Sequence, residues 1–115
     1  KKMKNQEMVK LLSLILLIDN DIDSRELEII KEIDNNEVYV EEYIKVIKKE
    51  TQYKKDKINF ILEKIKKQMK IIRITDREKI VDYIKKIIIS DKIIISEEKE
   101  VIKLIKEYWK IEVKY

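Results

Sequence analysis

Apolar residues recur along most of this chain at the three- and four-residue spacing that is typical of amphipathic helices. Short polar stretches interrupt this pattern and divide it into six segments. The predicted helices cover approximately residues 5–19, 23–33, 37–50, 56–70, 75–90 and 96–110. The pattern therefore predicts an all-α fold, in which about six helices form a single bundle.

The first predicted helix, about 5–19, is apolar around nearly its whole circumference in its second half. A helix of this kind is buried by neighbours on several sides, so we expect it to be a central helix. Polar residues mark the starts of other helices: Asp23, Asp56 and Ser96 are expected N-caps. Thr75 opens a full capping box with Glu78 three residues later. Because the chain has no Gly or Pro, we expect Asn20, Asn35 and Asn36 to end helices.

Two parts of the chain, about 5–36 and 75–110, share a pattern at a fixed offset of 72 positions. Each is an apolar helix, a short acidic turn and a second helix. The matching pairs are Val9/Val81, Ile15/Ile87, Asp19/Asp91, Ile22/Ile94, Ser24/Ser96, Glu26/Glu98, Glu28/Glu100, Lys31/Lys103 and Ile33/Ile105. We interpret this as an internal duplication, with linking helices at about 37–70. The helix at about 75–90 is then expected to be a second central helix.

The run Ile93-Ile94-Ile95 is a competing signal for a β-strand. The duplication aligns Ile94 with Ile22, which lies in a turn, and no other segment offers a convincing partner strand. We therefore predict a turn there.

Composition limits the classes of protein that remain. The chain of 115 residues predicts one domain with one core. Its net charge of +4 is a weak signal for nucleic acid, because a bias towards Lys codons gives the same excess. We expect Lys57, Lys64 and Lys67 to form a solvated face, and we predict no nucleic-acid partner. With no visible signal peptide and no apolar run long enough to span a bilayer, the default expectation is a cytoplasmic protein without a membrane span.

The residue inventory argues against an enzyme. The chain has no His and no Cys, which removes zinc sites, thiol nucleophiles and the common general bases. Neither a nucleophile elbow nor a Gly-rich phosphate loop is present. We therefore predict a protein without catalytic activity.

The first acidic turn contains Asp19, Asp21 and Asp23, which resemble the start of an EF-hand loop. The loop fails at its sixth position, where Ser24 replaces Gly, and at its twelfth, where Ile30 replaces the bidentate Glu. Helix capping accounts for the acids that begin helices. It does not account for Asp19 and Asp91, which follow helix C-termini, where the dipole disfavours an anion. Either each of these two carboxylates accepts a hydrogen bond from the backbone of the turn that follows it, or each lies beside a cation.

The twofold pattern of apolar helix, turn of the form Asp-x-x-Ile-x-x-x-Glu and amphipathic helix resembles the TerB-like family of tellurite-resistance proteins and its DnaJ-associated relatives. The likeness covers almost the whole chain. It implies an all-helical bundle in which acidic residues of the two turns gather into a metal-binding cluster. The implied residues are Asp19, Glu26, Asp91 and Glu98, and Asp21 and Asp23 strengthen the first half-site. The family's glycine is replaced by Asn20 and Lys92.

Two functions follow from these observations. The first is a TerB-like domain that holds Ca²⁺, Mg²⁺ or Mn²⁺ weakly and acts with protein partners in stress or tellurite- and metal-resistance complexes. The alternative is a helical protein–protein interaction module, alone or as one part of a larger chain, whose acidic turns are only helix caps.

Overall fold

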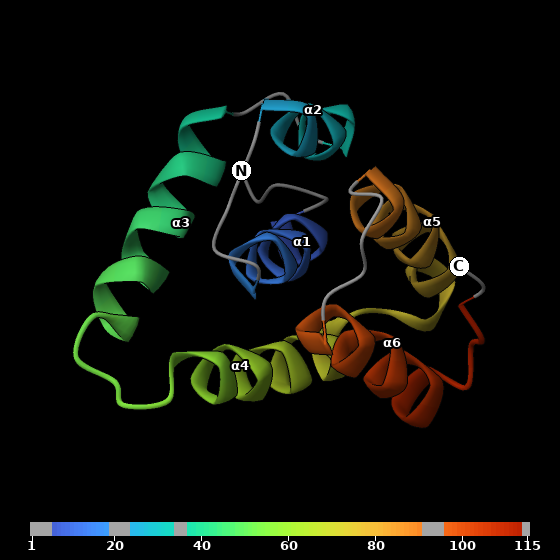
Figure 1. Ribbon diagram of the computed structural model, residues 1–115. Coiled ribbons are helices and arrows are strands. Elements are labelled where there is room, and N and C mark those ends of the chain that lie inside the picture. Colours follow the sequence, from blue (N-terminus) through green and yellow to red (C-terminus); the bar gives the residue numbers. More distant parts are fainter. Residues whose placement is uncertain (1–5, 19–23, 34–36, 91–95, 114–115) are drawn as a thin grey trace.

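The computed structural model describes residues 6–18, 24–33, 37–90 and 96–113. These residues form six α-helices and no strand (Figure 1), so the predicted all-α fold is confirmed for the described part of the chain. The helices are α1 (Gln6–Ile18), α2 (Ser24–Ile33), α3 (Glu37–Thr51), α4 (Lys57–Ile71), α5 (Ile74–Ser90) and α6 (Ser96–Trp109). The run Ile93-Ile94-Ile95 and the stop residues Asn20, Asn35 and Asn36 lie outside the described residues.

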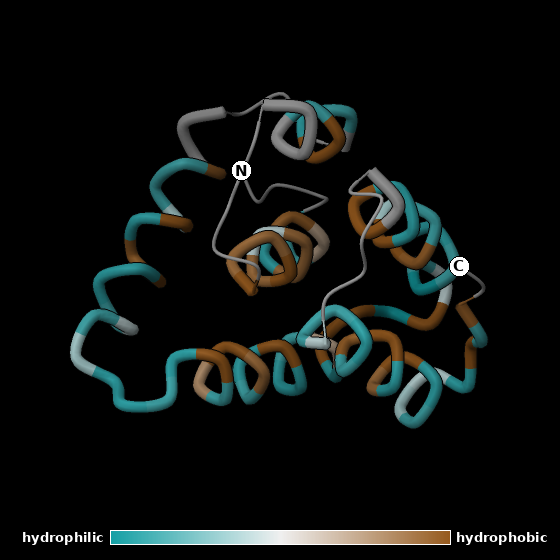
Figure 2. Tube along the Cα trace, in the orientation of Figure 1, coloured by the Kyte–Doolittle hydropathy of each residue, from teal (hydrophilic) through white to brown (hydrophobic). Residues whose placement is uncertain are grey.

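Helix α1 is the central helix, as its apolar circumference predicts. It contacts each of the other five helices, which surround it in Figure 1. Every residue from Met8 to Ile18 is buried except Lys10, which is half-buried. In Figure 2 the trace of α1 is largely hydrophobic, whereas α3 and α4 are hydrophobic mainly on the side facing it. A single hydrophobic core therefore forms around α1, with side chains from all six helices.

Helix α5 is not a second central helix, so this prediction is wrong. It packs mainly against α1 and α2, and its buried side is a stripe. The buried residues are Ile80, Val81, Ile84, Ile87 and Ile88. On its other side Lys79, Asp82 and Lys86 are exposed. Enclosing these charges would cost several kcal/mol each unless they were paired, so α5 keeps one side in water.

Helices α1 and α4 run antiparallel. At one end, Glu7 of α1 accepts hydrogen bonds from Gln68 near the end of α4. At the other end, Leu17 of α1 shares a pocket with Ile58 and Ile61 near the start of α4. Among the described residues this pair makes the most extensive contact between two helices, and it places the C-terminal end of α1 beside the turn that joins α3 to α4.

The structure confirms one of the predicted N-caps and contradicts two others. Asp56 caps α4 as predicted, since its Oδ1 accepts from the backbone N–H of Asn59 at 3.0 Å. Thr75 is not an N-cap, because α5 begins one residue earlier, at Ile74. The acid of that turn, Asp76, pairs instead with Arg73 at 3.3 Å. Ser96 is the first residue of α6 rather than the residue before it. Asp23 lies outside the described residues.

The end of α6 is anchored by Trp109. Its indole Nε1 donates to the backbone carbonyl of Met69 at 3.2 Å, which joins the C-terminal ends of α6 and α4. Lys110 follows with a φ of 58°, a left-handed conformation that costs a non-glycine residue about 1 kcal/mol. This conformation ends the helix and turns the chain back, so that Val113 is buried.

The helices of the two predicted units occupy matching stretches of the sequence. Within the described residues, α1 and α5 extend to Ile18 and Ser90, and α2 and α6 extend from Ser24 and Ser96, each pair 72 positions apart. The second helix of each unit also contacts the first helix of the other, α2 on α5 and α6 on α1. A common origin of the two units stays a prediction. No helix in the described ranges is long and apolar enough to cross a membrane.

Candidate functional site

In the sequence the two acidic segments follow α1 and α5, so the directions of these two helices bear on the predicted site. Glu7 in the first turn of α1 contacts Gln68 of α4. Arg77 in the first turn of α5 lies over the ring of Trp109, which is bonded to the neighbouring Met69. Both helices therefore begin at the same end of α4. Further along, Leu11 and Ile15 of α1 border the same small cavity as Ile84 of α5. The two helices thus run in the same general direction.

Four of the six predicted metal ligands, Asp19, Asp21, Asp23 and Asp91, lie outside the described residues. Glu26 lies in the first turn of α2, where only the backbone is described. Glu98 is described fully: it occupies the first turn of α6 and is only 3% exposed. Within the described ranges no three acidic side chains gather into a group that could hold a metal ion.

The burial of Glu98 is unusual for a carboxylate near a helix N-terminus. An acid that only complements the helix dipole does so from the surface. Burial of a carboxylate is costly unless a hydrogen bond or a positive charge compensates for it. Glu98 does interact with another group in the structure, and it is the residue that aligns with Glu26. Its position is therefore inside the protein, at the point where α6 begins.

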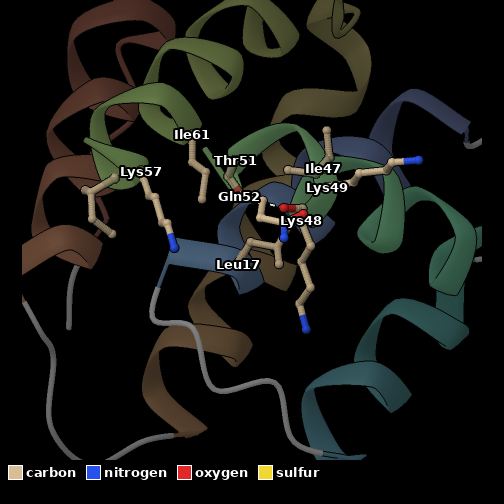
Figure 3. A pocket seen from close by; sticks show the side chains of 9 residues that line it. Leu17, Ile47, Lys48, Lys49, Thr51, Gln52, Lys57 and Ile61 are labelled. Atoms are coloured by element: carbon tan, nitrogen blue, oxygen red, sulfur yellow. Dashed lines mark hydrogen bonds between the residues drawn. The ribbon is translucent and has the colours of Figure 1, made fainter. Parts of the chain in front are cut away.

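A pocket of about 580 Å³ lies between the C-terminal end of α1, the end of α3 and the start of α4 (Figure 3). Its apolar lining consists of Leu17, Ile47, Ile58 and Ile61. Its polar lining consists of Lys48, Lys49, Thr51, Gln52 and Lys57.

The polar groups of this pocket are not arranged around one common position. The Thr51 hydroxyl donates to the carbonyl of Lys48 at 2.9 Å and so is used inside α3. In Figure 3 the Lys49 ammonium points away from those of Lys48 and Lys57, and the three groups do not converge on one position. An anion therefore finds no common set of donors there.

The Lys face predicted on α4 is only partly solvated. Lys67 is exposed as expected. Lys64 instead pairs with Glu50 of α3 at 2.9 Å and lies 5.2 Å from the centre of the Phe60 ring. Next to it, Lys66 donates to Glu63 at 3.0 Å, and this hydrogen bond together with the charge of Glu63 raises the pKa of Lys66.

Some polar features of the structure have no signal in the sequence pattern. Gln68 occupies a buried position in α4, and only its helical spacing from Ile61 and Ile65 marks that face. Arg77 falls within the predicted capping box, yet its side chain lies against Trp109. The burial of Gln68 and the position of the Arg77 side chain both depend on contacts between distant parts of the chain.

Comparisons with known proteins returned no match: no protein-family model, no curated protein and no solved structure is significantly similar to this chain. The resemblance to the TerB-like family therefore stays a prediction.

Proposed function

We propose that this chain is a non-enzymatic TerB-like helical domain whose two acidic turns bind a divalent cation, and that it acts with protein partners in stress or tellurite- and metal-resistance complexes. The supporting observation is the shared direction of α1 and α5, the helices that precede the two acidic segments in the sequence. In the sequence, residues 19–23 and 91–95 stand between α1 and α2 and between α5 and α6, at the same offset of 72 positions. Because α1 and α5 run in the same general direction, the C-terminal ends of these two helices lie toward the same side of the bundle.

The residue types define the ligand class. Asp19, Asp21, Asp23, Glu26, Asp91 and Glu98 offer only carboxylate oxygens, which suit Ca²⁺, Mg²⁺ or Mn²⁺ rather than softer metals. Lys92 adds a positive charge to the second turn, and no EF-hand loop pre-forms the cage. We therefore expect a dissociation constant of about 10⁻⁴–10⁻³ M, the range of weak Ca²⁺ modules.

The test is an amide NMR titration of the full chain with Ca²⁺ and with Mg²⁺. We expect saturable shifts confined to residues 19–26 and 91–98. They should disappear in Asp19→Asn and persist in Glu63→Gln, which removes an exposed acid on α4. The cation should also raise the melting temperature as its concentration increases. Flat or diffuse shifts up to millimolar cation would contradict a metal site and leave the acids as helix caps.

The alternative, a protein–protein interaction module, is favoured by a separate observation. Four large apolar or aromatic side chains are mostly exposed: Val46 (51%), Tyr53 (86%), Ile71 (57%) and Ile74 (77%). Ile71 and Ile74 flank the turn between α4 and α5. Exposed apolar side chains that are close together mark contact surfaces for other proteins. This function does not need a cation, so a flat titration would favour it.

A further inference from the structure

A second pocket, of about 410 Å³, lies where the C-terminal ends of α4 and α6 meet the first turn of α5. It is lined by Met69, Lys70, Arg77, Tyr108 and Trp109. This is the end of the bundle at which α1 and α5 begin, and none of the predicted cation ligands is among the residues that line the pocket.

Arg77 is the distinctive group of this pocket. The centre of its guanidinium lies 5.6 Å from the centroid of the Trp109 ring, which is within the range of a cation–π contact. Its Nε is buried and has no hydrogen-bond partner among the described residues. The nearby acid Asp76 is directed to Arg73 instead. Arg77 is therefore a cation beside Trp109 whose donors are not used by a described carboxylate.

The surroundings of Arg77 are positive and partly apolar. Lys70 adds a second positive charge, and none of the described residues that line the pocket is acidic. Tyr108 is 39% exposed and offers a hydroxyl at the rim. Ile74 is 77% exposed and precedes Arg77 by three positions in α5, so the two side chains are neighbours on the helix surface.

We propose that this pocket is a docking site for an acidic segment of a partner protein, in which an Asp or Glu carboxylate pairs with Arg77 beside an apolar side chain that covers Ile74. Arginine matches a carboxylate in shape, because two N–H groups donate to its two oxygens. The Lys70 ammonium neutralises any further acidic side chain of the partner segment. The apolar side chain next to this carboxylate in the partner segment covers Ile74, and so removes the exposed surface of Ile74 from water.

A single carboxylate suits this site better than a polyanion such as nucleic acid. Asp76, Glu78 and Glu107 are adjacent in the sequence to the lining residues Arg77 and Tyr108. The negative charges of these acids repel a ligand whose own negative charge extends beyond the pocket. A short acidic and apolar segment places its charge only on Arg77 and Lys70.

The test is a selection from a random twelve-residue peptide library on the immobilised full chain. We expect enrichment of Asp or Glu next to Leu, Ile, Val or Phe on the unmodified chain. The same enrichment should appear on Lys79→Gln, which removes an exposed cation from the same helix, and should be lost on Arg77→Gln. An enriched peptide is then titrated while the fluorescence of Trp109, the sole tryptophan, is recorded.

In this titration Arg77→Gln should weaken binding at least tenfold, whereas Lys79→Gln should change it less than twofold. Arg77→Lys, which keeps the charge but loses the paired donors, should bind with intermediate affinity, and circular dichroism of each variant verifies folding. Enrichment without acidic residues, equal binding by Arg77→Gln, or tighter binding of a single-stranded oligonucleotide would overturn the proposal. Asp19→Asn, which removes a predicted cation ligand, should leave peptide affinity unchanged. The proposals of a peptide site and of a cation site are therefore tested independently of each other.

Discussion

The side-chain amide of Gln68 donates to Glu7 twice, to its backbone carbonyl at 3.0 Å and to its Oε2 at 2.6 Å. The two residues are 61 positions apart, in α4 and in the first turn of α1. Gln68 is only 7% exposed, so its amide is a buried polar group whose hydrogen bonds are supplied by another helix. This contact holds the beginning of the central helix against α4.

Replacement of Gln68 by Met should therefore destabilise the protein. The two side chains are similar in length, so the main loss is the pair of hydrogen bonds, one of them to a charged group. We expect about 1–3 kcal/mol of unfolding free energy, because the acceptors of Glu7 lose a buried donor. Chemical denaturation measures the change. Lys67→Met, at the exposed neighbouring position, is the control and should stay within about 0.5 kcal/mol.

Removal of the cap of α4 should have a defined cost. Asp56→Ala leaves the backbone N–H of Asn59 without its acceptor, so we expect a loss of about 0.5–2 kcal/mol. Asp56→Asn keeps a side-chain oxygen at the same position and should retain most of the stability. The melting temperatures of the two variants are measured by thermal denaturation and compared. Equal melting temperatures for Ala and Asn would show that the side-chain oxygen does not stabilise α4.

The two helices that the duplication pairs can be compared by matched truncations. Ile15 is 3% exposed in α1 and Ile87 is 2% exposed in α5. Each change to Ala should destabilise the protein by about 2–5 kcal/mol through lost burial and the cavity left behind. Ile74→Ala, at a position 77% exposed, should cost less than about 0.5 kcal/mol. A tolerant Ile87 would contradict the structural equivalence of the two positions.

Ser13 is buried in the middle of α1, and its hydroxyl donates to the carbonyl of Val9 at 2.8 Å. This bond is local to the helix, since that carbonyl can also accept from the backbone of residue 13. Ser13→Ala removes the buried hydroxyl and improves helix propensity, so we expect a change between neutral and about 0.5 kcal/mol more stable. Denaturation measures it, and a loss above 1 kcal/mol would reveal a contact of the hydroxyl beyond α1.

The positions of the helices are determined largely by local sequence. Predicted and observed boundaries agree within about two residues, because apolar periodicity marks a helix and an N-cap such as Asp56 marks its start. The place of α1 at the centre was also predictable. Between Met8 and Ile18 only Lys10 is charged, and a stretch of this kind is stable only when other helices cover all of its sides.

Only the tertiary structure decided which faces meet. The duplication predicted equal roles for the first helices of its two units, yet the charges of α5 leave it at the edge of the bundle. The bonds of Gln68 with Glu7 and of Trp109 with Met69 join residues 61 and 40 positions apart. The placement of Arg77 over Trp109 depends on the same packing. Periodicity identifies the buried side of a helix, but it carries no information about which distant residue lies opposite, because that follows from the packing of all six helices together.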